Sequence, residues 1–318
     1  MLVSIYIAHR LFAAHDRALA AALAGRLAAK VGAERIFLPF CDTDEEDLVA
    51  EVKGRRLFEL DRDRLGRLDA MVALVHGPSL DDGVCMEIGY AAATGIPVLL
   101  LTTDFQVYSL TEAGPRLDFP DPLLQAVATR VIRVPRLGPL SSSHQQGATR
   151  YADFLSRNLS QVDTALDTAV ETLLHLSPPR RTSSTARDQD GLVYVEGSPY
   201  AAAGDDYLVR PCWDAGHRVV LPRRFTATDP VTGALDDLRA ACRASRLLAD
   251  VSGPETPPGT ALLIGAALAT GVRIAAVHLR PSYTHASGRE PNWRNLMIQY
   301  AVHAHLDDTE AVQAWLAM

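Results

Sequence analysis

A thirteen-residue stretch of this chain occurs twice, and this duplication limits the folds that the chain can adopt. Residues 83–95 read GVCMEIGYAAATG, and residues 259–271 read GTALLIGAALATG. The two stretches share their glycines, an Ile-Gly step and a closing Ala-Thr-Gly, but Glu87 stands opposite Leu263. A chain with an internal repeat folds as copies of one structural unit.

Other segments pair in the same order at a nearly constant offset. The segment LVYVEGSPY matches SIYIAHRLF and places Tyr194 opposite Tyr6. Near the end of each copy, NLMIQYA matches DPLLQAV, and Asn295 stands opposite Asp121. The order and the spacing together predict a tandem repeat of one unit.

Short apolar runs alternate with helical patterns in the first copy. Such alternation predicts a parallel sheet that is covered by helices on both faces. We therefore expect the α/β class, with two flavodoxin-like or Rossmann-like doubly wound sheets packed as a pseudo-dimer. Ligands of such sheets bind beyond the carboxyl ends of the strands. The predicted strands of the first copy are 2–8, 35–40, 69–77 and 96–102, and its predicted helices include 15–31 and 86–94.

The boundary between the copies follows a long amphipathic pattern at 149–176. The next residues, 177–191, read SPPRRTSSTARDQDG and lack apolar periodicity, which is typical of a solvated linker. We predict a first domain at 1–176, a linker at 177–191 and a second domain at 192–318.

Charge and composition exclude several classes of partner. A formal charge of −7 argues against a nucleic-acid backbone or an anionic membrane as the main partner. No apolar run approaches the roughly 20 residues that span a bilayer, and the first residues do not resemble a signal peptide. The four cysteines show no C-x-x-C spacing, which favours free thiols in a reducing cytosol. We expect a cytoplasmic protein.

Several carboxylates surround the expected start of the repeated helix. We place Glu87 in or just before its first turn, where the helix dipole favours an ionised carboxylate by roughly 0.3–1 kcal/mol. An ionised carboxylate is suited to attack on an anomeric carbon. Asp69, Asp81 and Asp82 lie upstream, and clustered carboxylates push their pKa values apart, which separates a nucleophile from a proton donor.

A structural interpretation of the same residues stays open at this point. A first-turn Glu is commonly a surface residue that stabilises its helix, and Asp-Asp-Gly is commonly a turn. The histidines, including His9, His15 and His76, show no metal-ligand or triad spacing. We therefore expect no metal site and no organic cofactor.

Three motifs together resemble the nucleoside 2-deoxyribosyltransferase family. They are IYIAHRLF near the start, Asp69 followed by DDGVCMEIGYAAATGIPV, and Asn-Leu-Met at 295–297. The resemblance covers about 1–135 and 192–318. It implies an N-glycosyl transferase that acts on small-molecule nucleosides and free bases.

The resemblance also implies roles for individual residues. Glu87 looks like the nucleophile and Tyr6 like the hydroxyl that orients it, while Asp69 and Asp81 look like the carboxylates that hold and protonate the base. Asn295 looks like the residue that binds the sugar 5′-hydroxyl, which in the family comes from a neighbouring subunit. The substrate-binding positions are Arg10, Phe12, Asp82, Gly83, Asn295 and Met297.

Each copy lacks what the other holds. The first copy keeps Glu87 but has Asp121 in place of the Asn, whereas the second copy has Asn295 but carries Leu263 in place of the nucleophile. We expect the two copies to pack as the family's subunits do and to form one complete site per chain. An apolar Leu263 would fill the vestigial pocket of the second copy.

The implied reaction is base exchange with retained configuration through a covalent glycosyl ester. Two alternatives remain. One is hydrolysis of a nucleoside or a nucleoside 5′-monophosphate, in which Arg10 or Arg294 would meet the phosphate. The other is a non-catalytic nucleotide-binding protein. The base, the sugar's 2′ substituent and any further homo-oligomer stay open.

Overall fold

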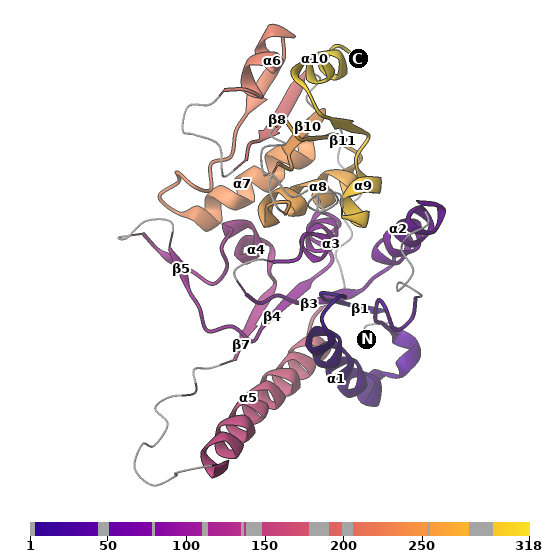
Figure 1. Cartoon of the computed structure of the whole chain (residues 1–318), viewed down its shortest axis with the longest axis vertical. Coiled ribbons are helices and arrows are strands. Elements are labelled where there is room, and N and C mark those ends of the chain that lie inside the picture. The colour runs from indigo at the N-terminus through magenta and orange to yellow at the C-terminus, as the bar shows by residue number, and fades with distance from the viewer. Residues whose placement is uncertain are drawn as a thin grey trace.

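The chain forms two five-stranded parallel sheets with helices packed between them and on their outer faces (Figure 1). The computed structural model describes residues 4–43, 51–77, 80–109, 114–134, 137, 148–177, 191–198, 206–252, 255–279 and 295–318. Within these residues no helix is both long and apolar enough to cross a lipid bilayer.

The first sheet has the strand order β2-β1-β3-β4-β7, and all its pairings are parallel. A two-stranded antiparallel ribbon, β5 with β6, lies in the connection after β4. The strands are β1 (Ile5–Ala8), β2 (Ile36–Phe37), β3 (Ala70–Leu74), β4 (Val98–Thr102), β5 (Tyr108–Ser109), β6 (Arg116–Leu117) and β7 (Arg130–Arg133). The helices are α1 (Ala14–Val31), the 3-10 turn η1 (Ala33–Arg35), α2 (Glu51–Leu65), α3 (Asp82–Ala93), α4 (Pro122–Val127) and α5 (Ala148–Leu174).

The second sheet has the strand order β9-β8-β10-β11-β12. If the five strands of each sheet are numbered along the chain, both sheets have the order 2-1-3-4-5. This 2-1-3-4-5 order is that of flavodoxin-like sheets. The strands are β8 (Leu192–Glu196), β9 (Arg218–Val220), β10 (Arg246–Asp250), β11 (Arg273–Val277) and β12 (Ala304–Leu306). The helices are α6 (Val209–Asp214), α7 (Pro230–Arg243), α8 (Pro258–Thr270), α9 (Leu296–Ala301) and α10 (Thr309–Ala317).

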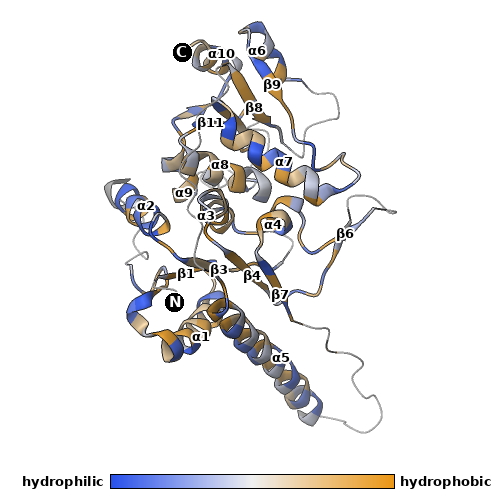
Figure 2. Ribbon diagram, turned by 180° about the vertical axis from the view of Figure 1, so that it is seen from behind, coloured by the Kyte–Doolittle hydropathy of each residue, from blue (hydrophilic) through white to orange (hydrophobic). Residues whose placement is uncertain are grey.

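The strands are apolar on both faces because helices cover both sides of each sheet (Figure 2). In β1, Ile5 and Ile7 face the core beneath α1 and α5, while Tyr6 and Ala8 face the core between the sheets. This alternation follows from the two-residue period of a strand. The central core contains residues from both halves of the chain, so the two sheets share one hydrophobic interior.

The closest contact between the halves is the crossing of α3 and α8. A Cβ atom added at Gly89 would lie 1.8 Å from the carbonyl oxygen of Leu262, and one added at Gly265 would lie 1.9 Å from that of Met86. No side chain fits at such distances, so the two backbones can meet only where glycine stands. The two glycines are the eighth residues of their helices and belong to the repeated stretch.

The structure confirms the predicted α/β class and the predicted strands of the first half, and all four strands have shorter bounds than predicted. One helix differs from expectation, because α3 begins at Asp82 rather than near 86. Most of the predicted linker, 178–190, lies outside the described residues, so the three-part division of the chain stays a prediction.

Candidate active site

Glu87 and Tyr6 form a buried pair between α3 and β1. The Tyr6 hydroxyl donates a 2.7 Å hydrogen bond to Oε1 of Glu87, and Glu87 is only 7% exposed. Glu87 is the sixth residue of α3, so the prediction that it lies in or just before the first turn is wrong. The helix starts earlier because Asp81 caps it, and the dipole effect therefore falls on Asp81 and Asp82 rather than on Glu87.

Asp81 and Asp82 occupy the amino end of α3. One carboxylate oxygen of Asp81 accepts a 2.9 Å hydrogen bond from the Val84 amide, which is a capping contact. Desolvation raises the pKa of Asp81, although hydrogen bonds to the carboxylate oppose this. Desolvation and the neighbouring Asp81 carboxylate raise the pKa of Asp82 to about 7. The pair is therefore suited to hold a proton near neutral pH.

Asn295 brings the second half of the chain to these carboxylates. Its Nδ2 donates a 2.7 Å hydrogen bond to Oδ1 of Asp82. Its Oδ1 accepts a 2.9 Å hydrogen bond from the amide of Met297, because Asn295 caps α9. The side chain is thus held from both ends. Gly83 leaves room for it, since an added Cβ there would lie 3.2 Å from Nδ2 of Asn295.

A cavity of about 450 Å³ opens above the amino end of α3. Phe12 lies at this cavity and is 71% exposed. Glu87 lies five residues along α3 from Asp82, which corresponds to about 7.5 Å of helix axis. The cavity is large enough for a small molecule. Its lining residues are Arg10, Phe12, Ala13, His15, Asp16, Asp81, Asp82, Glu255 and Asn295.

The structure does not bring Asp69 to this cavity. Asp69 precedes β3, and its carboxylate accepts a hydrogen bond from the Ser4 amide at 3.2 Å, at the amino ends of β1 and β3. The cavity lies at the carboxyl ends of the strands. Because all the strands of this sheet run in one direction, Asp69 lies at their other ends. The expectation that Asp69 holds or protonates the base does not fit this position.

A different carboxylate, Asp61 on α2, is buried and was missed by the sequence reasoning. Asp61 is 6% exposed, and α2 packs against α3 and α9. The sequence did indicate this burial, because Asp61 lies three residues after Phe58 and four residues before Leu65, on the same face of the helix as these two buried residues. An acid on the apolar face of an amphipathic helix is unusual.

An Asp–His pair borders the cavity as well. His76, which follows β3, has its Nε2 at 2.7 Å from Oδ1 of the buried Asp16. Asp16 lies in the first turn of α1, so the pair joins the loops that follow β1 and β3. Among the residues that the structure describes, no three His, Cys, Asp or Glu side chains are grouped to hold a metal ion.

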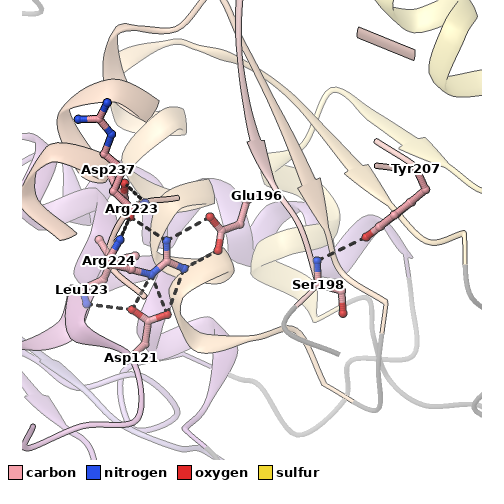
Figure 3. A network of polar contacts seen from close by, with 8 residues as sticks. All are labelled: Asp121, Leu123, Glu196, Ser198, Tyr207, Arg223, Arg224 and Asp237. Atoms are coloured by element: carbon pink, nitrogen blue, oxygen red, sulfur yellow. Dashed lines mark hydrogen bonds and ion pairs between the residues drawn. The ribbon is translucent and has the colours of Figure 1, made fainter. Parts of the chain in front are cut away.

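The corresponding place in the second half is filled by a buried ion cluster (Figure 3). Arg224 is 1% exposed, and its Nε lies 3.0 Å from Oδ1 of Asp121. Its two terminal nitrogens also donate hydrogen bonds to Glu196 and Asp237. Asp121 caps α4 as Asn295 caps α9, and an added Cβ at Gly259 would lie 2.0 Å from Oδ2 of Asp121.

The residues of the second half that match the Glu87–Tyr6 pair form no such pair. Leu263 is fully buried as the sixth residue of α8, and Tyr194 is fully buried in β8. The Tyr194 hydroxyl makes no hydrogen bond among the described residues. Leu263 was expected to fill this region, and Arg224 with its three carboxylates is buried there as well.

Comparisons with solved structures find proteins of low similarity. A crystal structure of a conserved protein from Enterococcus faecalis V583 shares 22% identity, covers 55% of this chain and 100% of its own, and has a TM-score of 0.33. The 2-deoxyribosyltransferase from the psychrotolerant bacterium Bacillus psychrosaccharolyticus shares 20% identity, covers 40% of this chain and 96% of its own, and has a TM-score of 0.30. No curated protein matches the chain significantly.

A family model described as nucleoside 2-deoxyribosyltransferase matches residues 5–166, which is half of the 318 residues. The match contains Tyr6, Asp81, Asp82 and Glu87 and ends within α5, before the second sheet. The chain belongs to the nucleoside 2-deoxyribosyltransferase family.

Proposed function

We propose that this protein transfers the sugar of a nucleoside from one base to another, with Glu87 as the nucleophile. The observation that carries the proposal is the buried carboxylate of Glu87, held by the Tyr6 hydroxyl, on the helix whose amino end lines a cavity with the acids Asp81 and Asp82. A positioned carboxylate near a second acid is the arrangement that retaining glycosyl transfer requires.

The first step would form a bond between a Glu87 oxygen and C1′ of the sugar while the bond from C1′ to the base nitrogen breaks. The electron pair of that bond leaves with the base, which must gain a proton. A second base would then attack C1′, release Glu87 and restore the original configuration. Because each step uses the same carboxylate, the kinetics should be of the ping-pong type.

Asp81 and Asp82 are the groups that we propose as proton carriers for the leaving base. Both line the cavity, and their raised pKa values favour a proton on one of them at neutral pH. Asp69 has no part in this proposal because it lies at the other edge of the sheet. Phe12 and Arg10 line the mouth and would contact the base or the sugar.

We also propose that the chain is a fused pseudo-dimer with one complete site. The equal sheet orders, the matched glycines of α3 and α8, and the matched caps at Asp121 and Asn295 support two copies of one unit. The second region would bind no substrate, because the buried cluster around Arg224 occupies it. Calorimetry should give one nucleoside per chain, whereas two would contradict the single site.

The activity is tested by incubating the protein with a 2′-deoxynucleoside and a different free base. Exchange of the base supports transfer, and release of base without exchange indicates hydrolysis. If nucleoside binds but neither exchange nor release occurs, the protein is a binding protein. Glu87→Gln should lower exchange at least about 10⁴-fold. Glu171→Gln on the exposed face of α5 is the matched control and should react like the wild type. Full activity of Glu87→Gln would overturn the assignment of the nucleophile.

A further inference from the structure

Acidic groups outnumber basic groups among the lining residues that the structure describes. Four of these residues carry carboxyl groups, Asp16, Asp81, Asp82 and Glu255, and two carry basic groups, Arg10 and His15. Asp16 is 1% exposed and lies in the first turn of α1, so a carboxylate already occupies the helix end that would otherwise attract an anion.

Glu255 is the carboxylate that the second half of the chain contributes. It stands exposed in the loop before α8 and lines the same cavity as Asp81 and Asp82. Its negative charge adds to the burial that raises the pKa of both aspartates, while Arg10 acts in the opposite direction on Asp81. The surroundings of Asp81 and Asp82 therefore already disfavour the negatively charged forms of these two carboxyl groups.

Among the described lining residues, the donors that could offset a bound phosphate are few. The Asn295 amide has two N–H donors, one of which is engaged with Asp82, and its Oδ1 is engaged with the Met297 amide. His15 has its Nε2 at 3.6 Å from the Asp16 carboxylate, so its ring already has an acidic partner. A phosphate group carries about −1.5 to −2 charges at pH 7, and like charges placed together are a strong means of rejecting a ligand.

We propose that Glu255, supplied by the second half, is a specificity-determining residue that makes the site reject nucleoside 5′-phosphates and accept nucleosides with a free 5′-hydroxyl. This inference rests on the proposed function. Glu255 acts by its charge on the substrate, not on the reacting atoms. The selection should weaken as salt screens the exposed Glu255.

The test compares base exchange with 2′-deoxyadenosine and with its 5′-monophosphate as donors, for the wild type, Glu255→Gln and Glu255→Lys. The wild type should favour the nucleoside by at least about tenfold in kcat/KM, because the phosphate and the Glu255 carboxylate carry like charges. Glu255→Gln should reduce that ratio, and Glu255→Lys should reduce it further, by about tenfold in all. The matched control is Glu310→Lys on α10, at the outer face of the second sheet, which should leave the ratio unchanged.

Binding is measured in parallel with the Glu87→Gln variant, so that the comparison does not depend on turnover. Tighter binding of the monophosphate by Glu255→Lys, lost again in high salt, supports charge selection. The inference is overturned if the wild type uses both donors equally, or if Glu255→Lys leaves the ratio of the two kcat/KM values unchanged. Neither result contradicts the proposed base exchange. Absence of any exchange and any binding contradicts the proposed function, and this inference falls with it.

Discussion

The side chain of Asn295 donates a 2.7 Å hydrogen bond to Asp82, which lies 213 residues away in the sequence. The contact joins the cap of α9 in the second half to the first residue of α3 in the first half. A comparable contact occurs at the other end of the assembly, where Asp121 of the first half binds Arg224 of the second. The two halves therefore contact each other at both of these positions, and the cavity described above lies at the contact between Asn295 and Asp82.

Replacement of Tyr6 by Phe should lower kcat/KM for base exchange by about tenfold or more, because the Glu87 carboxylate loses the donor that orients it. The stability loss should be about 1 kcal/mol, the usual contribution of one hydrogen bond. Steady-state kinetics and thermal unfolding of the same samples measure the two effects.

The matched control for this change is Tyr194→Phe. The Tyr194 hydroxyl is buried without a hydrogen-bond partner among the described residues, so its removal should leave exchange unchanged and should not lower stability. Equal losses of activity in both variants would show that Tyr6 has no special relation to Glu87.

Replacement of Gly89 by Ala should destabilise the protein by several kcal/mol and also impair exchange. The new Cβ would lie 1.8 Å from the Leu262 carbonyl oxygen, so α3 and α8 must separate and Asn295 would move away from the cavity. Gly25→Ala in α1 is the control, because an added Cβ there meets nothing within 4 Å. Alanine at that helical position should stabilise by about 0.5–1 kcal/mol. Thermal unfolding measures both, and an unchanged midpoint for Gly89→Ala would contradict the close crossing.

Replacement of Asp82 by Asn should change the dependence of stability on pH. The pKa of Asp82 is about 7 in the folded state, against about 3.9 for an unperturbed Asp. Between these values the folded state binds more protons than the unfolded state, so the contribution of Asp82 to stability falls as pH rises from about 4 to about 7. The variant should therefore gain more in melting temperature at pH 8 than at pH 5.

The control for the pH effect is Asp307→Asn, an exposed residue between β12 and α10 whose replacement should act equally at both pH values. A change in melting temperature of the same size at pH 5 and pH 8 for Asp82→Asn would indicate that burial does not perturb this carboxyl group.

Much of the fold followed from the sequence because apolar runs and repeated glycines are local signals. The strands appear where runs such as IYIA and VLLLT predict them, since buried parallel strands must be apolar on both faces. The start of α3 was misplaced because Asp-Asp-Gly is commonly a turn, whereas here Asp81 caps the helix and the next residues form its first turn.

The site was only partly predictable because its parts come from distant segments. The resemblance to the family assigned Asp69 to the site from its place in a motif. The residue lies at the amino end of β3, whereas the cavity lies at the carboxyl ends of the strands. The roles of Arg224 and Glu255 could not be read from the sequence, because neither belongs to a recognisable motif. Their importance depends on which side chains the crossing of α3 and α8 brings near them.

The central claim is that a carboxylate of the first half and an amide of the second half act on the same sugar. The most direct measurement is the steady-state rate of base exchange by Asn295→Ala, compared with Asn158→Ala in α5. The account predicts a KM raised by about tenfold or more for Asn295→Ala and wild-type kinetics for Asn158→Ala. Wild-type kinetics for a folded Asn295→Ala variant would contradict the shared site.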